Sequence, residues 1–210
     1  MDLNLRGKLA LVTGASKGIG LACARQLAEE GCHLHLASRT KADLERASES
    51  IQARHNVSVT IHPCDLSNGD TARSLAAACP DIDILVNNAG AIPAGDLQAV
   101  DEARWREAWN LKVFGYINLC RAVYPVMKAR GGGVIVNVLG AAGERPTWGY
   151  IAGSAGNASL MAFTRGMGGS SLGDRIRVVA CNPGLIRTER MESCAPARRR
   201  SSAIRGAGRN

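Results

Sequence analysis

Residues 8–20 read KLALVTGASKGIG, and this stretch decides the fold. A short apolar run enters a turn that holds three glycines, and the apolar residues after the turn recur at helical spacing as far as Gly31. The stretch therefore predicts a strand, a glycine-rich turn and a helix. The backbone N–H groups at the start of that helix would face any phosphate above the sheet, and glycine permits its close approach. We expect a dinucleotide to bind at this turn.

The same unit of strand and helix recurs along the chain. Strands are predicted at 8–12, 33–37, 58–62, 84–87, 134–138 and 177–181, and helices after the glycine turn and at 41–55, 69–79, 101–130 and 152–172. This alternation implies right-handed βαβ units and a parallel sheet that is covered on both faces. We expect an α/β fold with a Rossmann-type doubly wound parallel sheet of six strands. One dinucleotide-binding domain would span 1–192, followed by a basic, disordered tail at 193–210.

Composition and charge argue against several functions. The net charge is +8 over 210 residues, but the segment 193–210 carries five arginines and no acidic residue, which leaves +3 for the rest. Such a run is usually solvated, so we expect neither specific nucleic-acid binding nor membrane binding. The N-terminus lacks the apolar region of a signal peptide and no apolar stretch is long enough to span a membrane, which predicts a cytoplasmic protein. The seven cysteines include no C-x-x-C pair, so no metal site is expected.

Four motifs, in order along the chain, resemble those of the short-chain dehydrogenase/reductase family. The turn at 13–20 carries that family's T-G-x-x-x-G-x-G pattern, and the segment 64–67, Cys-Asp-Leu-Ser, is similar to its adenine-contacting acidic loop. The segment 87–90 reads Asn-Asn-Ala-Gly, the family's N-N-A-G, and Pro183-Gly184 with Thr188 matches its P-G-x-x-x-T. The resemblance implies a nicotinamide dinucleotide as cofactor and a small-molecule carbonyl or alcohol as substrate.

The cofactor positions follow from these motifs and from charge. They are Gly14, Ser16, Lys17, Gly18, Ile19, Gly20, Arg39, Asp65, Leu66, Asn87, Ala89, Gly90, Pro183, Gly184 and Thr188. A site selective for NAD(H) places an acidic residue at the end of the second strand, where its carboxylate would repel the 2′-phosphate of NADP(H). Here that strand leads into Arg39 without an acidic residue, and Lys17 stands in the glycine turn. Both side chains can bind the 2′-phosphate, so NADP(H) is favoured. If both are instead solvated surface cations that contact no phosphate, NAD(H) is the alternative.

The catalytic positions of the family are altered in this chain. The resemblance implies a Tyr that passes a proton, a Lys four residues later, a Ser that steadies the substrate oxygen and an Asn on the long helix. The segment 157–165, NASLMAFTR, is similar to the stretch that begins with the Lys. Asn157 therefore occupies the Lys position and Gly153 the Tyr position. Gly140 replaces the Ser, and Lys112 replaces the Asn.

A looser register keeps Asn110 as the Asn and pairs Tyr150 with Ser154, but neither register restores the Ser or the Lys. Two interpretations stay open. In the first, the site is rearranged around Tyr150, Lys112 and Asn157, with Tyr150 one helical turn from the usual Tyr position. A nearby Lys ammonium would then favour the phenolate form of Tyr150. In the second, the site has lost its acid, and the protein binds NADP(H) without catalysing a reaction.

Two further expectations concern the end of the chain and its assembly. The family usually continues past P-G-x-x-x-T into a substrate-covering helix pair and a seventh strand, whereas the C-terminal residues here show no strand-like pattern. We therefore expect an open substrate side and an exposed edge on the sixth strand. In the family, the helices that correspond to 101–130 and 152–172 form a dimer interface. A homodimer through these helices is predicted, with exposed apolar groups at Trp105, Trp109 and Phe163.

Overall fold

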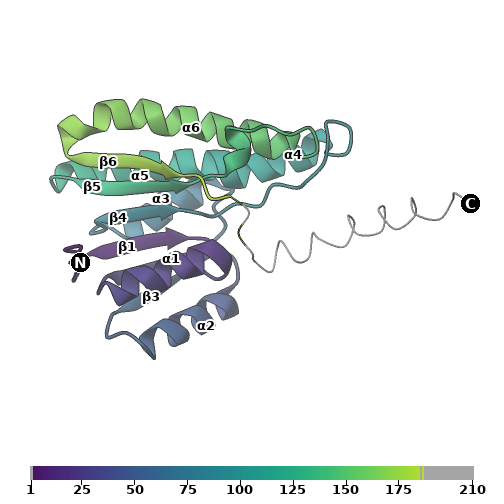
Figure 1. Cartoon of the computed structure of the whole chain (residues 1–210). Helices are drawn as coiled ribbons and strands as arrows, with labels where there is room; N and C mark the ends of the chain where they lie inside the picture. Colours follow the sequence, from purple (N-terminus) through teal and green to yellow (C-terminus); the bar gives the residue numbers. More distant parts are fainter. Residues whose placement is uncertain (1, 185, 187–210) are drawn as a thin grey trace, which may run out of the picture.

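The centre of the molecule is a six-stranded parallel sheet with the strand order β3-β2-β1-β4-β5-β6 (Figure 1). It is seen in a computed structural model that describes residues 2–184 and 186. The strands are β1 (Leu9–Thr13), β2 (His33–Ser38), β3 (Val59–Pro63), β4 (Ile84–Asn87), β5 (Gly133–Val138) and β6 (Ile176–Cys181). The order runs outward from β1 in both directions, so the predicted Rossmann-type doubly wound sheet of six strands is confirmed. The basic tail expected at 193–210 lies outside the described residues.

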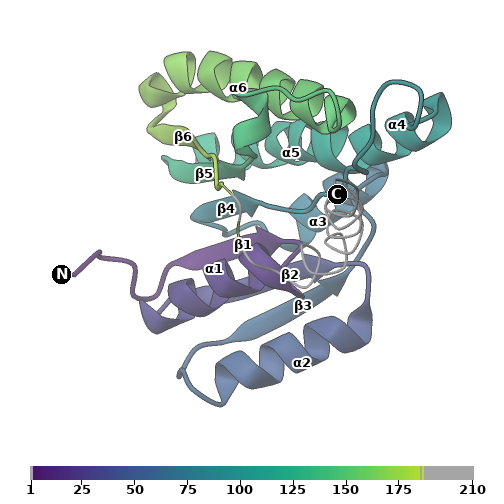
Figure 2. The same cartoon turned by 45° about the vertical axis from the view of Figure 1, so that its right-hand side comes forward.

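Helices cover both faces of this sheet. They are α1 (Gly18–Glu29), α2 (Lys41–Gln52), α3 (Gly69–Ala78), α4 (Glu102–Trp109), α5 (Gly115–Ala129) and α6 (Ile151–Ser171), with the short turns η1 (Asn110–Phe114), η2 (Ala141–Gly143) and η3 (Leu172–Asp174). α1 and α2 pack on one face, and α3, α5 and α6 lie on the other, as Figures 1 and 2 show. Among the described residues, no helix is both long and apolar enough to cross a bilayer.

The strand sequences explain why the core has two sides. In β1, Ala10 and Val12 face α1 and α2 while Leu11 faces the opposite layer, and all three are fully buried. Apolar runs of this kind are typical of parallel strands covered on both faces. At the edge, Val179 of β6 points to the same side as α1 but is 49% exposed. Within the described residues β6 pairs with β5 alone.

The helix predicted at 101–130 is not uniform. The chain runs as α4, then as one π turn at Asn110–Phe114, then as α5. The N–H of Gly115 donates to the carbonyl of Asn110, five residues earlier, which is the hydrogen bond of a π turn. A Cβ at Gly115 would lie 3.0 Å from the carbonyl oxygen of Leu66, so glycine allows this close approach of the helix to the loop after β3. Lys112 lies in this turn and is 8% exposed.

A buried chain of side-chain hydrogen bonds joins β4, β5 and α6. Nδ2 of Asn87 donates to Oδ1 of Asn137 at 3.0 Å, and Nδ2 of Asn137 donates to Oγ1 of Thr164 at 2.9 Å. Asn87 also donates to Sγ of Cys120 on α5 at 3.3 Å. A buried polar group that loses its partner destabilises the fold, so this chain fixes the two strands and α6 relative to one another.

Replacing the middle member of that chain should destabilise the protein. Asn137→Ala leaves buried polar groups of Asn87 and Thr164 without their partner, and we expect the free energy of unfolding to fall by about 1–3 kcal/mol. Urea unfolding followed by tryptophan fluorescence measures the change. Asn56→Ala, at an exposed asparagine, is the control and should change the free energy by less than about 0.5 kcal/mol. Equal stability of the two variants would contradict the role given to Asn137.

Candidate active site

The glycine-rich turn leads from β1 into α1. Gly14 and Gly18 have φ values of 63° and 55°, a backbone conformation that favours glycine. A Cβ at Gly20 would come within 2.3 Å of the Gly14 carbonyl oxygen, so the turn is too tight for a side chain there. α1 has no acidic residue in its first turn and no side-chain cap at Lys17. Its N-terminal N–H groups therefore suit an anion, which fits the pyrophosphate of a nicotinamide dinucleotide.

The turn is fastened to the segment after β4 by the side chains of Thr13 and Asn88. Oγ1 of Thr13 accepts hydrogen bonds from the backbone N–H groups of Asn88 at 2.9 Å and Ala89 at 3.0 Å. Nδ2 of Asn88 donates to the carbonyl of Thr13 at 3.0 Å. Sequence reasoning missed these two positioning residues. The predicted cofactor residue Asn87 has a side chain that is 1% exposed and bonded within the core, whereas Ala89 and Gly90 are partly exposed.

The region predicted for the 2′-phosphate contains a carboxylate that sequence reasoning did not consider. Nζ of Lys17 lies 3.3 Å from the carboxylate of Asp43, in the first turn of α2. Asp43 also pairs with Arg46. Arg39 is exposed just after β2. Oγ of Ser16 lies 3.0 Å from Oγ of Ser38, the last residue of β2. The predicted cation Lys17 thus has an anionic partner, because α2 starts next to the glycine turn.

The loop after β3 is ordered by a local turn. Oδ1 of Asp65 accepts a hydrogen bond from the backbone N–H of Ser67 at 3.0 Å, and Leu66 is buried. At the other end of the predicted site, the backbone N–H of Ala141 donates to the carbonyl of Pro183 at 3.4 Å. This bond brings the segment with Gly184 against the loop after β5. Thr188, predicted to follow in this segment, lies outside the described residues.

Lys112 reaches from the π turn to the carboxyl end of β5. Its Nζ donates to the carbonyl of Val138 at 2.7 Å and to the hydroxyl of Tyr116 at 2.8 Å, and it lies 4.6 Å from the centre of the Tyr116 ring. The hydroxyl of Tyr116 donates to the same carbonyl at 2.9 Å. The lysine stem crosses Gly90, where a Cβ would lie 2.4 Å from Cδ of Lys112. Sequence reasoning missed Tyr116, which stands four residues after Lys112, the spacing of neighbours on a helix.

Tyr150 stands at the N-terminus of α6, and its ring occupies the space beside Gly153. A Cβ at Gly153 would fall 2.0 Å from Cζ of Tyr150. Backbone hydrogen bonds to Gly95 fix the residues before and after Tyr150. The N–H of Gly95 donates to the carbonyl of Gly149 at 2.9 Å, and the carbonyl of Gly95 accepts from the N–H of Ile151 at 3.3 Å. Ser154, which the looser register pairs with Tyr150, accepts a hydrogen bond at its Oγ from the N–H of Thr147 at 3.2 Å.

Asn157 lies one turn further along α6. Its Nδ2 donates to the carbonyl of Gly153 at 2.8 Å, and a Cβ at Gly140 would lie 3.1 Å from the same nitrogen. Its Oδ1 is buried and has no hydrogen-bond partner among the described residues. A buried acceptor without a donor is unfavourable, so a hydroxyl of a bound molecule fits this position. The structure therefore brings Tyr150 and Asn157 together around Gly153, while Lys112 lies at the carbonyl of Val138, two residues before Gly140.

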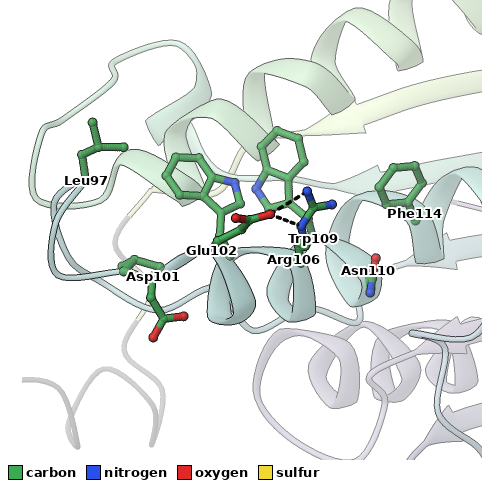
Figure 3. A pocket seen from close by; sticks show the side chains of 9 residues that line it. Leu97, Asp101, Glu102, Arg106, Trp109, Asn110 and Phe114 are labelled. Carbon is green, nitrogen blue, oxygen red and sulfur yellow. Dashed lines mark hydrogen bonds and ion pairs between the residues drawn. The ribbon is translucent and has the colours of Figure 1, made fainter.

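An open hollow of about 530 Å³ lies on the outer side of α4 (Figure 3). Its wall is formed by Leu97, Val100, Asp101, Glu102, Trp105, Arg106, Trp109, Asn110 and Phe114. The expectation that Trp105, Trp109 and Phe163 are exposed is wrong, because all three are partly buried against the core. Nε1 of Trp109 donates to the carbonyl of Ala152 at 3.0 Å. Large apolar side chains that are exposed near these helices include Phe114, at 49%, and Leu97, Trp148 and Leu172.

Comparison with known proteins assigns the family. A family model described as short chain dehydrogenase matches residues 8–199 of this chain. The chain belongs to the short-chain dehydrogenase/reductase family. It is similar to dehydrogenase/reductase SDR family member 4 of Oryctolagus cuniculus, with 34% identity over 189 residues that cover 88% of this chain and 72% of that protein.

Solved structures of other short-chain dehydrogenases/reductases have the same fold. L-Sorbose reductase from Gluconobacter frateurii, in complex with NADPH and L-sorbose, matches with a TM-score of 0.88 and 32% identity over 92% of this chain and 75% of that one. A 7α-hydroxysteroid dehydrogenase in complex with NADH and 7-oxo glycochenodeoxycholic acid matches with a TM-score of 0.85 and 30% identity. The match covers 90% of this chain and 76% of that chain. These relatives bind NADPH or NADH together with small molecules, which supports a nicotinamide cofactor for this family member.

Proposed function

We propose that this short-chain dehydrogenase/reductase is an NADP(H)-dependent enzyme that interconverts a carbonyl and an alcohol, with Tyr150 as the proton donor. One observation carries the proposal. Three glycines of the candidate site each leave space that a polar side chain of another position fills. The stem of Lys112 lies over Gly90, the amide of Asn157 beside Gly140, and the ring of Tyr150 over Gly153. Tyr150 and Asn157 therefore both lie at Gly153 on α6, and Lys112 reaches the carbonyl of Val138, two residues before Gly140.

The choice of Tyr150 follows from the surroundings of the other two tyrosines. Tyr116 is 1% exposed, and burial raises the pKa of its hydroxyl well above the usual value, with the nearby Cys120 adding to the shift. It therefore cannot meet a substrate. Tyr124 donates to Asp174 at 2.8 Å, away from the glycine turn. Tyr150 is partly exposed at the start of α6, so its phenol can pass a proton to a substrate oxygen.

Each of the other residues has a distinct role in this proposal. When bound, the nicotinamide supplies or accepts the hydride. The ammonium of Lys112, held at the Val138 carbonyl, places positive charge near the end of β5 and stabilises a developing anionic oxygen there. The buried Oδ1 of Asn157 has no partner among the described residues and would accept a hydrogen bond from a ribose hydroxyl of the cofactor. Because Gly140 carries no hydroxyl, Tyr150 must itself orient the substrate oxygen.

Removing one hydroxyl group tests the proposal. The native chain should oxidise NADPH with at least one member of a panel of ketones, aldehydes and quinones. Tyr150→Phe should lower kcat by about 100-fold or more, because general acid catalysis is lost. Tyr124→Phe is the matched control, since its hydroxyl bonds to Asp174, and it should keep the native kcat. Steady-state kinetics at saturating NADPH measures both variants.

A second variant tests whether the position of the Tyr150 hydroxyl matters as well as its presence. Gly153→Ala keeps the hydroxyl of Tyr150 but places a Cβ where the ring lies, so kcat should fall while NADPH affinity is retained. Activity that is undiminished in Tyr150→Phe would reject Tyr150 as the acid. If NADPH raises the melting temperature of the native chain but no substrate is consumed, the protein binds the nucleotide without catalysis, and the proposed activity is wrong.

The proposed preference for NADP(H) rests on charge at the end of β2. Arg39 is exposed directly after that strand, and residues 36–39 include no acidic residue that could bind the ribose hydroxyls of NAD(H). The carboxylate of Asp43, on α2, is paired with Lys17 and Arg46. Lys17 is the second cation, although Asp43 shares it at 3.3 Å. A guanidinium can form two parallel hydrogen bonds with a phosphate, so Arg39 contributes more to the preference than Lys17.

Reversing one charge should reverse the cofactor preference. The native chain should bind NADPH about tenfold more tightly than NADH, or better, which corresponds to about 1.4 kcal/mol. Arg39→Asp should invert this order, because its carboxylate repels a 2′-phosphate and can accept the ribose hydroxyls. Arg54→Asp, with the same charge change at an exposed residue after α2, should leave the order unchanged. Calorimetric titration that finds equal affinities for the native chain would contradict the preference.

We also propose a homodimer through α6 and the helix pair α4–α5. One face of α6 carries the exposed small residues Ala158, Ala162, Gly166 and Gly169. Small residues at this spacing allow a second helix to approach closely. A large apolar group, Phe114, is also exposed on the neighbouring helix. Because α6 also carries Asn157 and starts at Tyr150, its packing against a second copy would steady the candidate site.

A charge in the middle of that face should prevent assembly. The native chain should sediment as a dimer at tens of micromolar, and Ala162→Glu should sediment as a monomer because a buried unpaired carboxylate is costly at an interface. Ala77→Glu, at an exposed alanine of α3, is the control and should remain dimeric. A monomeric native chain, or a dimer that tolerates Ala162→Glu, would show that α6 does not form the interface.

A further inference from the structure

Three potential metal ligands meet near the β3 edge of the sheet, away from β5 and α6 at the other end of the strand order. They are His35 on β2, His62 on β3 and Cys79 directly after α3. In the parallel register His62 pairs with Ala37, which is two residues after His35 and therefore on the same face of β2. The two histidines are thus diagonal neighbours on one face of the sheet. Nδ1 of His35 lies 2.7 Å from Nε2 of His62, and Sγ of Cys79 lies 3.7 Å from the same nitrogen. All three donor atoms lie within 4.8 Å of one another.

We propose that this cluster binds one Zn²⁺ ion through Nδ1 of His35, Nε2 of His62 and Sγ of Cys79. Imidazole nitrogen and thiolate sulfur are the donors that zinc prefers, and three protein ligands leave a fourth tetrahedral position for water. Cys79 is buried, whereas both histidines are partly exposed, so an ion can enter from solvent and keep one water ligand. The site is separate from the proposed oxidoreductase activity, and neither depends on the other.

Two of the three donor–donor distances can be compared directly with those of a tetrahedral zinc site. Zinc–nitrogen bonds of about 2.0 Å and zinc–sulfur bonds of about 2.3 Å place two nitrogens about 3.3 Å apart and a nitrogen and a sulfur about 3.5 Å apart. The distance of 3.7 Å between Sγ of Cys79 and Nε2 of His62 is within about 0.2 Å of the second value. The 2.7 Å between His35 and His62 is a hydrogen bond that must open by about 0.6 Å for zinc to enter. Small rotations of two half-buried rings on β2 and the edge strand β3 can supply this movement.

Binding of one zinc ion to the cluster releases one proton, that of the Cys79 thiol. In the metal-free protein burial lowers the pKa of His35 and His62, so both rings are neutral near pH 7 and share one N–H in their hydrogen bond. Burial raises the pKa of the Cys79 thiol to about 11, so Cys79 is then protonated. Zinc displaces the thiol proton to solvent, and each imidazole carries its remaining proton on the nitrogen that faces away from the metal.

The ion would connect three elements near the adenine end of the candidate cofactor site. β3 is the edge strand of the sheet, and Asp65 and Leu66 follow it directly. A metal that joins β3 to β2 and α3 would restrain this edge and the loop after it. Zinc should therefore raise the melting temperature of the protein, in contrast to an ion held loosely at a surface histidine.

Zinc and cobalt binding to the full, reduced chain tests the proposal. Competition with a chromophoric chelator should give one zinc ion per chain with a dissociation constant in the micromolar range or tighter. Co²⁺ in place of zinc should give the intense visible bands of a tetrahedral site and a near-ultraviolet band from thiolate ligation. Cys79→Ser should abolish the thiolate band, and His62→Gln should weaken zinc affinity at least tenfold.

Two control variants, at a cysteine and a histidine outside the cluster, test whether the loss of zinc binding is specific to the cluster. Cys194→Ser and His55→Gln should keep the native zinc affinity, the cobalt spectrum and the zinc-dependent rise in melting temperature. If Cys79→Ser fails to fold, His35→Gln takes its place and should show the same loss of affinity. A native chain that binds less than one zinc ion, a cobalt spectrum without thiolate ligation, or unchanged zinc binding in the cluster variants would each overturn the proposal. The two rings would then be a hydrogen-bonded pair only.

Discussion

The buried hydroxyl of Thr13 is the contact on which the layout of the candidate site depends. It accepts hydrogen bonds from the backbone of Asn88 and Ala89, and the Asn88 amide returns a bond to the Thr13 carbonyl. Because Thr13 is fully buried, water does not compete for these bonds, and the segments after β1 and β4 hold one relative position. That junction sets both the glycine turn and Gly90, over which the stem of Lys112 passes.

The space left by three glycines determines where the polar side chains of the candidate site lie. Side chains at Gly90, Gly140 or Gly153 would meet Lys112, Asn157 or Tyr150 respectively. The π turn completes this arrangement, because it turns Lys112 inward to the carbonyl at the end of β5. The glycines and the polar residues of the site are therefore interdependent: restoring a side chain at one of the three glycines displaces the polar group that now fills its place.

Two pairs of neighbouring strands illustrate how parallel register brings distant residues together. At β4 and β5, the pairing of Asn87 with Asn137 places two amides side by side and links them to α6. At β2 and β3, the same kind of pairing sets His35 beside His62, although 26 residues separate them in the chain. Both clusters lie on the face covered by α3, α5 and α6. Neither is visible as a motif, because no fixed local spacing defines it.

The sequence alone determined the elements, the doubly wound sheet and the glycine-rich turn, because hydrophobic periodicity and glycine spacing are local properties. It also named Tyr150, Lys112 and Asn157 as candidates, but it could not tell how they fill the space beside three glycines. Only the tertiary structure decided the π turn, the pairing of Lys17 with Asp43 and the cluster around His62. These features depend on contacts between residues far apart in the chain. Strand register and helix packing set those contacts, and local sequence does not encode them.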